Sequence, residues 1–293
     1  MDEKLSVLHP DFLNETVEFL KPQEALTVTA DSTAYSAVEC LKEHHSGALL
    51  VTSSEGSLRG IFTERDVLTK LALFDNDLRA VPVQEVMTED PESIELNASI
   101  ARALYMLSTG GYRHLVVTSS EYDKPRMISV VNILDHIFDA SQNAESSTVV
   151  DPSAADRFFT SPVAVLKPAR AITVSDSTTI KEAVETMNRH LIGALPVIDS
   201  NGSLCGIFTE RDLLEKIILT DLTLDNTPVA EVMTKNPDTA GETEDNVASA
   251  LRTLKNGHYR HIPVNCKDYL GILSIKNFIS YLAHSILEDM RKN

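Results

Sequence analysis

The chain repeats itself, and this repeat restricts its possible fold more than any other feature of the sequence. Residues 60–66 (GIFTERD) return unchanged as residues 206–212, at an offset of 146 residues. The same offset relates residues 85–88 (EVMT) to residues 231–234. A constant offset of this kind indicates two homologous halves.

Each half contains a second, weaker repeat at a shorter offset. Residues 129–134 align with 63–68 after a shift of 66 residues, and residues 271–277 align with 206–212. The chain therefore has four copies of one unit. Three strands and two helices in about 60 residues bury too little apolar surface for a stable core, so we expect the copies to pair through their sheets.

The copies predict two domains joined by a linker. The segment between the halves is rich in Ser, Ala and Asp and has no apolar period, which is typical of a surface linker. We predict a first pair of copies over 12–140, a linker over 141–157 and a second pair over 158–288.

The repeated heptapeptide lies where a buried strand is expected to turn into a helix. Its apolar run ends in Gly-Ile-Phe, and the residues after Asp66 and Asp212 show helical periodicity. At such a junction the free N–H groups of a helix, a hydroxyl and a carboxylate can all meet a ligand. The alternative is that Asp66 and Asp212 only cap their helices. The return of the whole heptapeptide favours a ligand site.

The order of these segments resembles the CBS domain, named after cystathionine β-synthase. Residues 193–197 (GALPV) are followed by a turn at 199–202 (DSNG) and then by the heptapeptide. Four such copies resemble two CBS pairs, or Bateman modules, over residues 12–288. The resemblance implies an α+β (mixed α/β) fold in which each pair has two small three-stranded sheets flanked by helices.

The resemblance also implies a regulatory protein rather than an enzyme. Proteins of this family bind adenosyl compounds (AMP, ADP, ATP or S-adenosylmethionine) in clefts between paired copies. An adenine nucleotide is therefore the expected ligand, without a covalent cofactor, and energy sensing is the expected role. The resemblance further implies self-association through CBS modules and a separate effector protein, which the sequence does not identify. The alternative is a ligand-free scaffold that mediates protein assembly.

Ligand roles in the first and third copies follow from the resemblance. Asp66 and Asp212 match the acid that accepts hydrogen bonds from the ribose hydroxyls, a task that suits a carboxylate. Thr63 and Thr209 match the hydroxyl that meets ribose or phosphate. The main chain expected to line the adenine slot lies at Gly47, Ala48, Leu49, Gly193, Ala194 and Leu195. A glycine there lets the backbone approach a flat ring closely.

The second and fourth copies depart from this pattern. Asn132 and Asn277 replace the Asp, and an amide has one acceptor oxygen, so we expect weaker or absent nucleotide binding there. These copies instead carry Arg-His steps, which suit a phosphate and resemble the phosphate-contacting step in the gamma subunit of AMP-activated kinase. The residues concerned are Arg113, His114, Arg260 and His261. The alternative is that both arginines pair with surface acids, and Lys21 and Lys167 are the next candidates for the phosphate.

Composition argues against several other classes of protein. The chain has 26 basic and 43 acidic residues and a formal charge of −17, which disfavours a nucleic-acid partner. It lacks an apolar run of membrane-span length and an apolar signal core, so we expect a cytoplasmic protein without a membrane partner. Three unevenly spaced cysteines predict reduced, mostly buried thiols and no metal site. No phosphate-loop or nucleophile-elbow motif is present, and we predict no catalytic residue.

Overall fold

The structure is a computed structural model that describes residues 15–74, 77–142 and 158–290. The chain folds into two compact units. Unit 1 comprises the described residues of Met1–Glu24, Glu92–Arg170 and Asp238–Asn293, and unit 2 comprises those of Ala25–Pro91 and Ala171–Pro237. Unit 2 therefore holds the first and third copies, and unit 1 holds the second and fourth. The predicted grouping of consecutive copies, 12–140 and 158–288, is a different division and stays a prediction.

Each copy forms a small mixed sheet flanked by helices, which confirms the predicted mixed α/β fold. The sheets have four strands within the described residues, so the predicted number of three was wrong. In each sheet a central antiparallel hairpin has a parallel strand on one side and a two-residue antiparallel strand on the other. The added strand comes from the segments that connect the copies. Such pairs are too short to show an apolar period.

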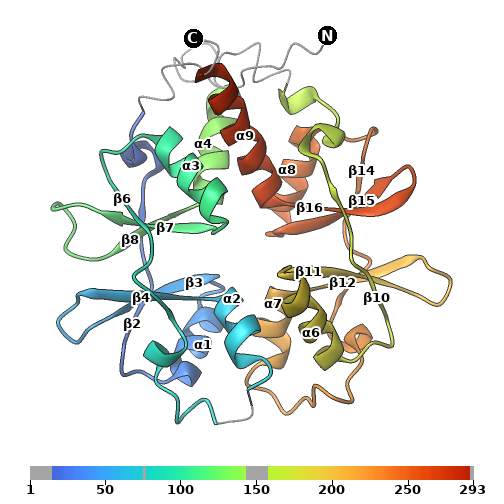
Figure 1. The fold of residues 1–293 in the computed structure, drawn as a ribbon, viewed down its shortest axis with the longest axis horizontal. Helices are drawn as coiled ribbons and strands as arrows, with labels where there is room; N and C mark the ends of the chain where they lie inside the picture. Colours follow the sequence, from blue (N-terminus) through green and yellow to red (C-terminus); the bar gives the residue numbers. More distant parts are fainter. Residues whose placement is uncertain (1–14, 75–76, 143–157, 291–293) are drawn as a thin grey trace. The chain divides into compact units, whose positions relative to one another are not determined.

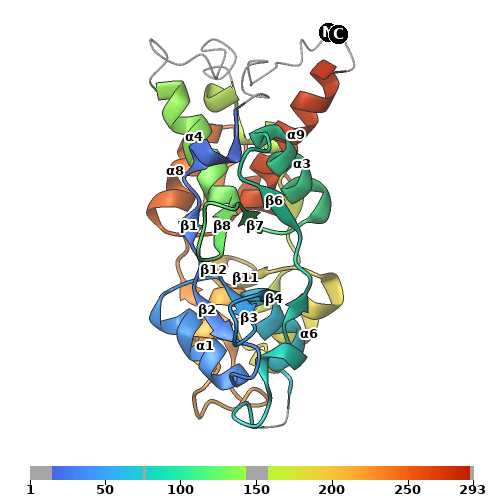
Figure 2. The ribbon, with the colours of Figure 1, turned by 90° about the vertical axis from the view of Figure 1, so that its left-hand side faces the viewer.

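The first copy lies in unit 2 and its sheet has the order β2-β3-β4-β5, of which Figure 2 labels β2, β3 and β4. Its strands are β2 (Thr27–Thr29), β3 (Ala48–Thr52), β4 (Leu58–Thr63) and β5 (Thr88–Glu89). Its helical segments are α1 (Ala34–Glu43), α2 (Glu64–Asp66), the π-helix η3 (Val67–Leu71) and the 3-10 helix η4 (Val83–Glu85). Thr33 caps α1 because its hydroxyl accepts from the N–H of Ser36.

The third copy repeats this arrangement in unit 2, with the sheet order β10-β11-β12-β13. Its strands are β10 (Val174–Ser175), β11 (Ala194–Ile198), β12 (Leu204–Thr209) and β13 (Thr234–Lys235). Its helical segments are α6 (Ile180–His190), α7 (Glu210–Asp212), the π-helix η6 (Leu213–Ile217) and the 3-10 helix η7 (Val229–Glu231). Figure 1 shows α6 and α7 on one side of this sheet.

The second and fourth copies form unit 1. The second has strands β6 (Ser93–Glu95), β7 (His114–Thr118), β8 (Arg126–Ser129) and β1 (Gln23–Glu24), with η2 (Val17–Leu20), α3 (Ile100–Gly110) and α4 (Val130–Gln142). The fourth has strands β14 (Ala240–Gly241), β15 (His261–Cys266), β16 (Tyr269–Ser274) and β9 (Ala169–Arg170), with η5 (Val163–Leu166), α8 (Val247–Asn256) and α9 (Ile275–Met290). Because α4 continues to Gln142, residues 141–142 of the predicted linker are helical, and the rest of it lies outside the described residues.

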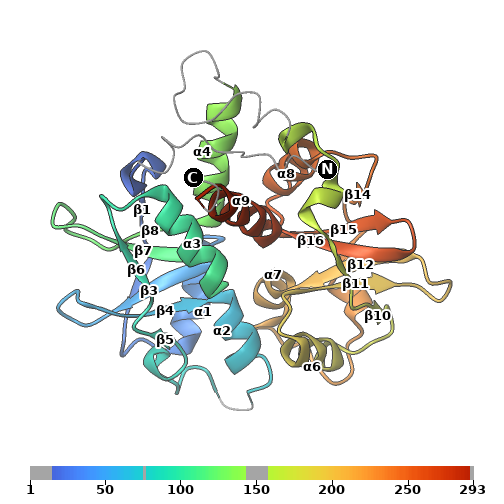
Figure 3. The same cartoon turned by 45° about the horizontal axis from the view of Figure 1, so that its top comes forward.

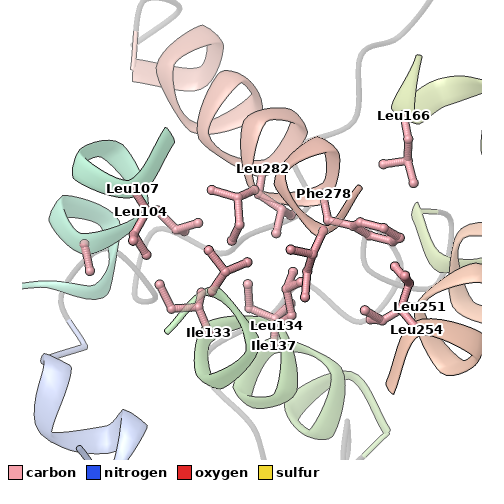
Figure 4. Packing of buried hydrophobic residues seen from close by; sticks show 14 of the residues in the cluster. Leu104, Leu107, Ile133, Leu134, Ile137, Leu166, Leu251, Leu254, Phe278 and Leu282 are labelled. Atoms are coloured by element: carbon pink, nitrogen blue, oxygen red, sulfur yellow. The ribbon is translucent and has the colours of Figure 1, made fainter. Parts of the chain in front are cut away.

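Each unit has one hydrophobic core that both of its copies share. In unit 1, helices α3, α4 and α9 pack against one another (Figure 3). Figure 4 shows the α4 residues Ile133, Leu134 and Ile137 among the side chains of the neighbouring helices. In unit 2 the core contains Phe62 and Phe208, the phenylalanines of the two heptapeptides. Equivalent copies are therefore held together by burial of apolar side chains.

Candidate functional site

The Thr and Asp of the first heptapeptide form a capping box at the end of β4. The backbone N–H and the hydroxyl of Thr63 donate to Oδ2 of Asp66 over 2.9 and 2.7 Å. In return, the Asp66 N–H donates to the Thr63 hydroxyl over 3.4 Å. The N-cap is therefore Thr63, and Asp66 is the third helical residue of the capping box rather than the N-cap itself.

The second oxygen of Asp66 has partners of its own. The hydroxyl of Thr88 donates to Oδ1 over 3.1 Å, and the ammonium group of Lys70 lies 2.7 Å from the same oxygen. The Asp66 residue is only 4% exposed. A carboxylate offers about four acceptor positions, so hydrogen bonds within unit 2 already use all of them.

The third copy repeats this polar cluster. Thr209 donates its N–H and hydroxyl to Oδ2 of Asp212 over 2.9 and 2.7 Å. Thr234 and Lys216 meet Oδ1 over 3.2 and 2.5 Å. Asp212 is also 4% exposed. We call these two groups the Asp66 cluster (Thr63, Asp66, Lys70, Thr88) and the Asp212 cluster (Thr209, Asp212, Lys216, Thr234).

The two repeated segments of each half pack on each other. A Cβ atom on Gly60 would lie 2.4 Å from Sδ of Met87, and one on Gly206 would lie 2.2 Å from Sδ of Met233. Thr88, the next residue after Met87, supplies the hydroxyl that reaches Asp66. The EVMT segment therefore fits the surface that GIFTERD presents, which accounts for the joint repetition of both segments.

The Glu and Arg of the heptapeptides link the first and third copies through reciprocal ion pairs. Nε of Arg65 lies 2.8 Å from Oε1 of Glu210, and Nε of Arg211 lies 3.5 Å from Oε1 of Glu64. Both carboxylates are buried, at 1% and 2% side-chain exposure. A self-complementary contact of this kind needs the same residues on both sides. Sequence reasoning missed this role, although the exact identity of the two heptapeptides was a signal for it.

Gly193 lies against one of these buried carboxylates. A Cβ atom there would come within 3.1 Å of the Glu210 carboxyl carbon. The N–H of Glu210 also donates to the Gly193 carbonyl over 3.1 Å. A glutamate side chain therefore lies close to this glycine, and the approach of an adenine ring predicted there stays a prediction.

Strand register places the predicted adenine-slot residues beside the threonines. Ala48 pairs with Thr63 and Leu49 with Phe62, and in the third copy Ala194 pairs with Thr209 and Leu195 with Phe208. The Gly47 carbonyl accepts from the N–H of Glu64 over 3.2 Å. All four segments that were predicted to contact ribose or adenine thus lie in unit 2.

The Arg-His steps occupy the equivalent positions in unit 1. His114 pairs with Ser129 and His261 with Ser274 across their hairpins. The carbonyls of Arg113 and Arg260 accept from the residues after those serines, over 3.0 Å each. Arg113 and Arg260 therefore correspond in position to Gly47 and Gly193.

Burial lowers the pKa of two groups in these steps. Burial, with a smaller effect of the neighbouring Arg113 charge, lowers the pKa of His114 from 6.5 to about 4. Burial also lowers the pKa of Arg260 to about 10, which leaves it protonated at neutral pH. Lys21 and Lys167 end the 3-10 helices η2 and η5 in the left-handed backbone region and also belong to unit 1.

The asparagines of unit 1 keep the cap but not the acid. Oδ1 of Asn132 accepts from the N–H and the hydroxyl of Ser129 over 2.8 and 2.9 Å, and Asn277 makes the same contacts with Ser274. The Asn277 side chain also donates to the Leu166 carbonyl over 3.3 Å. An amide can make this last bond and a carboxylate cannot, which explains the departure at this position.

Two smaller sequence expectations can be compared with the structure. All three cysteines are partly exposed, so the prediction of mostly buried thiols was wrong, although burial raises the pKa of each. Within the described residues, no helix is long and apolar enough to cross a membrane.

Comparison with known proteins identifies the family. The model of the CBS domain matches residues 20–73, 83–137, 162–219 and 229–284, which is more than half of the chain. The chain therefore belongs to the CBS-domain family, as the resemblance in its sequence indicated.

The curated relatives that match most of this chain are longer than it is. It is 28% identical over 280 residues to the CBS domain-containing protein CBSCBSPB5 of Arabidopsis thaliana, which covers 86% of this chain and 50% of that protein. It is 24% identical over 311 residues to the meiotically up-regulated gene 70 protein of Schizosaccharomyces pombe, which covers 89% and 42%. The chain thus spans about half the length of the curated relatives it matches.

A solved structure supports the fold. Protein MJ1225 from Methanocaldococcus jannaschii has a TM-score of 0.74 and 20% sequence identity, with 91% of this chain and 99% of that chain covered. At this identity the likeness concerns the fold alone.

Proposed function

We propose that this chain is a regulatory protein that binds an adenosyl ligand (AMP, ADP, ATP or S-adenosylmethionine) and modulates a separate protein. The observation that carries the proposal is the pair of Thr-x-x-Asp clusters at the strand-to-helix junctions of unit 2. They occur in a CBS-domain chain whose other two copies have lost the acid.

The ligand's ribose would bind at Asp66 and Asp212. A carboxylate can accept hydrogen bonds from both hydroxyls of a vicinal diol, and the threonine hydroxyls lie beside it. The main chain at 47–49 and 193–195 would receive the adenine, because strand register holds it next to the threonines.

Isothermal titration calorimetry and thermal melting test the proposal. We expect AMP, ADP, ATP or S-adenosylmethionine to release or absorb heat and to raise the melting temperature at millimolar concentration, since a ligand that binds the folded state stabilises it. If none of the four has either effect, the proposed function is wrong.

A ligand-free scaffold is the second candidate, and one observation favours it. The Thr, Glu, Arg and Asp of both heptapeptides have partners within unit 2, so packing alone accounts for their repetition. The absence of nucleotide binding, together with assembly onto a partner protein in pull-down experiments with and without AMP, would support this candidate.

The phosphate is proposed to bind at the Arg-His steps. Replacement of Arg113 or Arg260 by Ala should weaken AMP binding far more than adenosine binding, because a guanidinium attracts a dianion and has little effect on a neutral ribose. AMP affinity should also fall as salt rises. Equal losses for AMP and adenosine would move the phosphate elsewhere, with Lys21 and Lys167 tested next by the same titration.

Several further parts of the proposal follow from family membership. We propose energy sensing as the role, a cytoplasmic location, self-association through CBS modules, and no catalysis. The two acids of the heptapeptide support the absence of catalysis. Glu64 pairs with Arg211, whereas Asp66 contacts two threonines and Lys70. They do not share a site for proton transfer.

A further inference from the structure

The Asp66 and Asp212 carboxylates already have a full set of donors. Oδ2 accepts from the threonine of the cap, and Oδ1 accepts from a second threonine and a lysine. A vicinal diol needs acceptor positions on the same group. A ligand that binds through Asp66 or Asp212 must therefore displace an internal donor.

The lysine is the donor best placed to yield. Lys70 and Lys216 are 37% and 42% exposed, whereas the cap threonine is held by the turn that begins the helix. Nζ of Lys70 also donates to the carbonyls of Val86 and Met87 over 2.9 and 2.7 Å, and Lys216 donates to that of Val232 over 2.7 Å. Because these carbonyls also hold the ammonium group, it can lose its contact with the carboxylate oxygen and stay near its present position.

Of the four copies, only the two that carry the acid have a lysine four residues after it. Each lies in the π-helix that follows the heptapeptide, η3 or η6. In unit 1 the following helices begin as α-helices, and the aligned residues are His136, which pairs with Glu15 over 2.6 Å, and Tyr281, which stacks on Phe158. π-Helical turns in otherwise α-helical segments are frequent at functional sites.

We propose that Lys70 and Lys216 set the affinity of the two sites by competing with the ligand's ribose diol for Oδ1 of Asp66 and Asp212. This inference rests on the proposed function. Ligand binding exchanges an ammonium donor for hydroxyl donors, so the lysines weaken binding and restrict it to ligands that offer both hydroxyls. They are affinity-setting residues that act through the aspartates.

The test uses the full chain with Lys70→Met and Lys216→Met, separately and together, because Met keeps the length and apolar contacts of the lysine stem. Adenosine is the probe, since it carries no phosphate whose attraction to the lysine charge would confuse the result. 2′,3′-Dideoxyadenosine is the comparison ligand because it lacks the diol. We expect adenosine to bind about tenfold more tightly to the double variant, and dideoxyadenosine binding to stay unchanged.

Lys181→Met is the matched control. Lys181 lies in the same unit, and its ammonium is 2.7 Å from the exposed Asp225 carboxylate. This variant removes the same charge without touching either cluster, so its adenosine affinity should equal that of the wild type.

The outcomes separate the inference from the proposed function. If the wild type binds adenosine and the Met variants bind it equally or more weakly, the lysines do not compete, and the inference is overturned while the function stands. An equal gain for dideoxyadenosine also overturns it. If neither wild type nor variants bind adenosine, AMP, ADP, ATP or S-adenosylmethionine, the function fails and the inference with it.

A second pair of variants covers loss of folding. Thr88→Val and Thr234→Val remove the other donor to Oδ1 and leave the lysines in place. If circular dichroism shows that the Met variants are unfolded, these variants decide. A tighter adenosine affinity supports competition for Oδ1, and an unchanged or weaker one overturns it.

Discussion

At the junction between the last central strand and the following helix, unit 2 carries Thr-Glu-Arg-Asp in both copies, whereas unit 1 carries Ser-Val-Val-Asn and Ser-Ile-Lys-Asn. The second position shows the sharpest contrast. Unit 2 buries Glu64 and Glu210 at this position, whereas unit 1 buries the apolar side chains of Val130 and Ile275. The same fold therefore accepts either solution at this point.

The contrast shows what the charges of unit 2 contribute. Buried ion pairs lose much of their Coulomb energy to desolvation, and apolar residues of similar size often stabilise a fold equally well or better. Unit 1 is a natural example of that replacement. We infer that the reciprocal pairs of unit 2 specify how its two copies meet more than they stabilise them.

A second difference depends on the first. At Gly193 a Cβ atom would lie 3.1 Å from the carboxyl carbon of Glu210, whereas the carbonyl of the equivalent residue in the fourth copy, Arg260, accepts from the N–H of Ile275. Glycine therefore occurs where the junction carries a buried acid, and arginine occurs where the junction carries an apolar residue. The chemistry of each junction is consequently set by groups of residues rather than by single positions.

Breaking one reciprocal pair should give the largest effect. Arg65→Met leaves the Glu210 carboxylate buried without the guanidinium that lies 2.8 Å away. Loss of one partner of a buried pair is strongly destabilising, so we expect a loss of about 3 kcal/mol in the free energy of unfolding. Urea unfolding measures it.

The control for this variant transfers the solution of unit 1. A chain with Glu64→Val, Arg65→Val, Glu210→Ile and Arg211→Lys carries the unit 1 residues at the second and third positions of both junctions and removes both buried glutamates. It should recover most of the stability that Arg65→Met loses. If Arg65→Met is as stable as the wild type, the pair does not contribute to stability, and the contrast between the units has no energetic meaning.

Exchange of the cap residues should give the next largest effect. Asp66→Asn keeps an acceptor for Thr63, as Asn132 does for Ser129, but removes the charged partner of Lys70. The lost charge-assisted bond should lower the free energy of unfolding by about 2 kcal/mol. Thermal and urea unfolding of Asp66→Asn and Asp212→Asn check this value.

The reverse exchange provides the matching control in unit 1. Asn277→Asp would turn a carboxylate toward the Leu166 carbonyl, which now accepts a hydrogen bond over 3.3 Å. It should also be destabilising. If both exchanges are neutral, the acid and the amide are interchangeable caps, and the Asp loses its separate role.

Local sequence patterns were sufficient to predict the repeated part of the fold. The apolar runs that end in Gly-Ile-Phe predicted buried strands that turn into helices. Strands β4 and β12 do end at Thr63 and Thr209, where α2 and α7 begin. The short strand β5 was missed because two exposed polar residues carry no periodicity.

Long-range partners could not be predicted from the sequence. No local sequence pattern shows that Arg65 pairs with Glu210, which lies in the other half of the chain. Nor does any show that Lys70 and Thr88 occupy the remaining hydrogen-bond positions of Asp66. The sequence therefore showed which residues matter without showing what they contact. The burial of the aspartates could not be predicted for the same reason, since it depends on residues from the EVMT segment.

The smallest effect concerns pH and separates the units by their histidines. Unit 1 carries His114 where unit 2 carries Ala48, and burial beside Arg113 lowers its pKa from 6.5 to about 4. Below pH 6.5 the unfolded chain binds a proton that the folded protein does not bind until about pH 4. Stability from this group is therefore complete above pH 6.5 and is lost as pH falls toward 4.

His114→Gln should remove this part of the pH dependence because the amide does not titrate. Urea unfolding between pH 7.5 and about pH 4.5 measures it, with His45→Gln as the control, since the His45 side chain is 82% exposed and changes nothing buried. We expect the control to follow the wild type and His114→Gln to show a shallower decline. If His114→Gln follows the wild type throughout, the imidazole takes up its proton equally in the folded and unfolded chains.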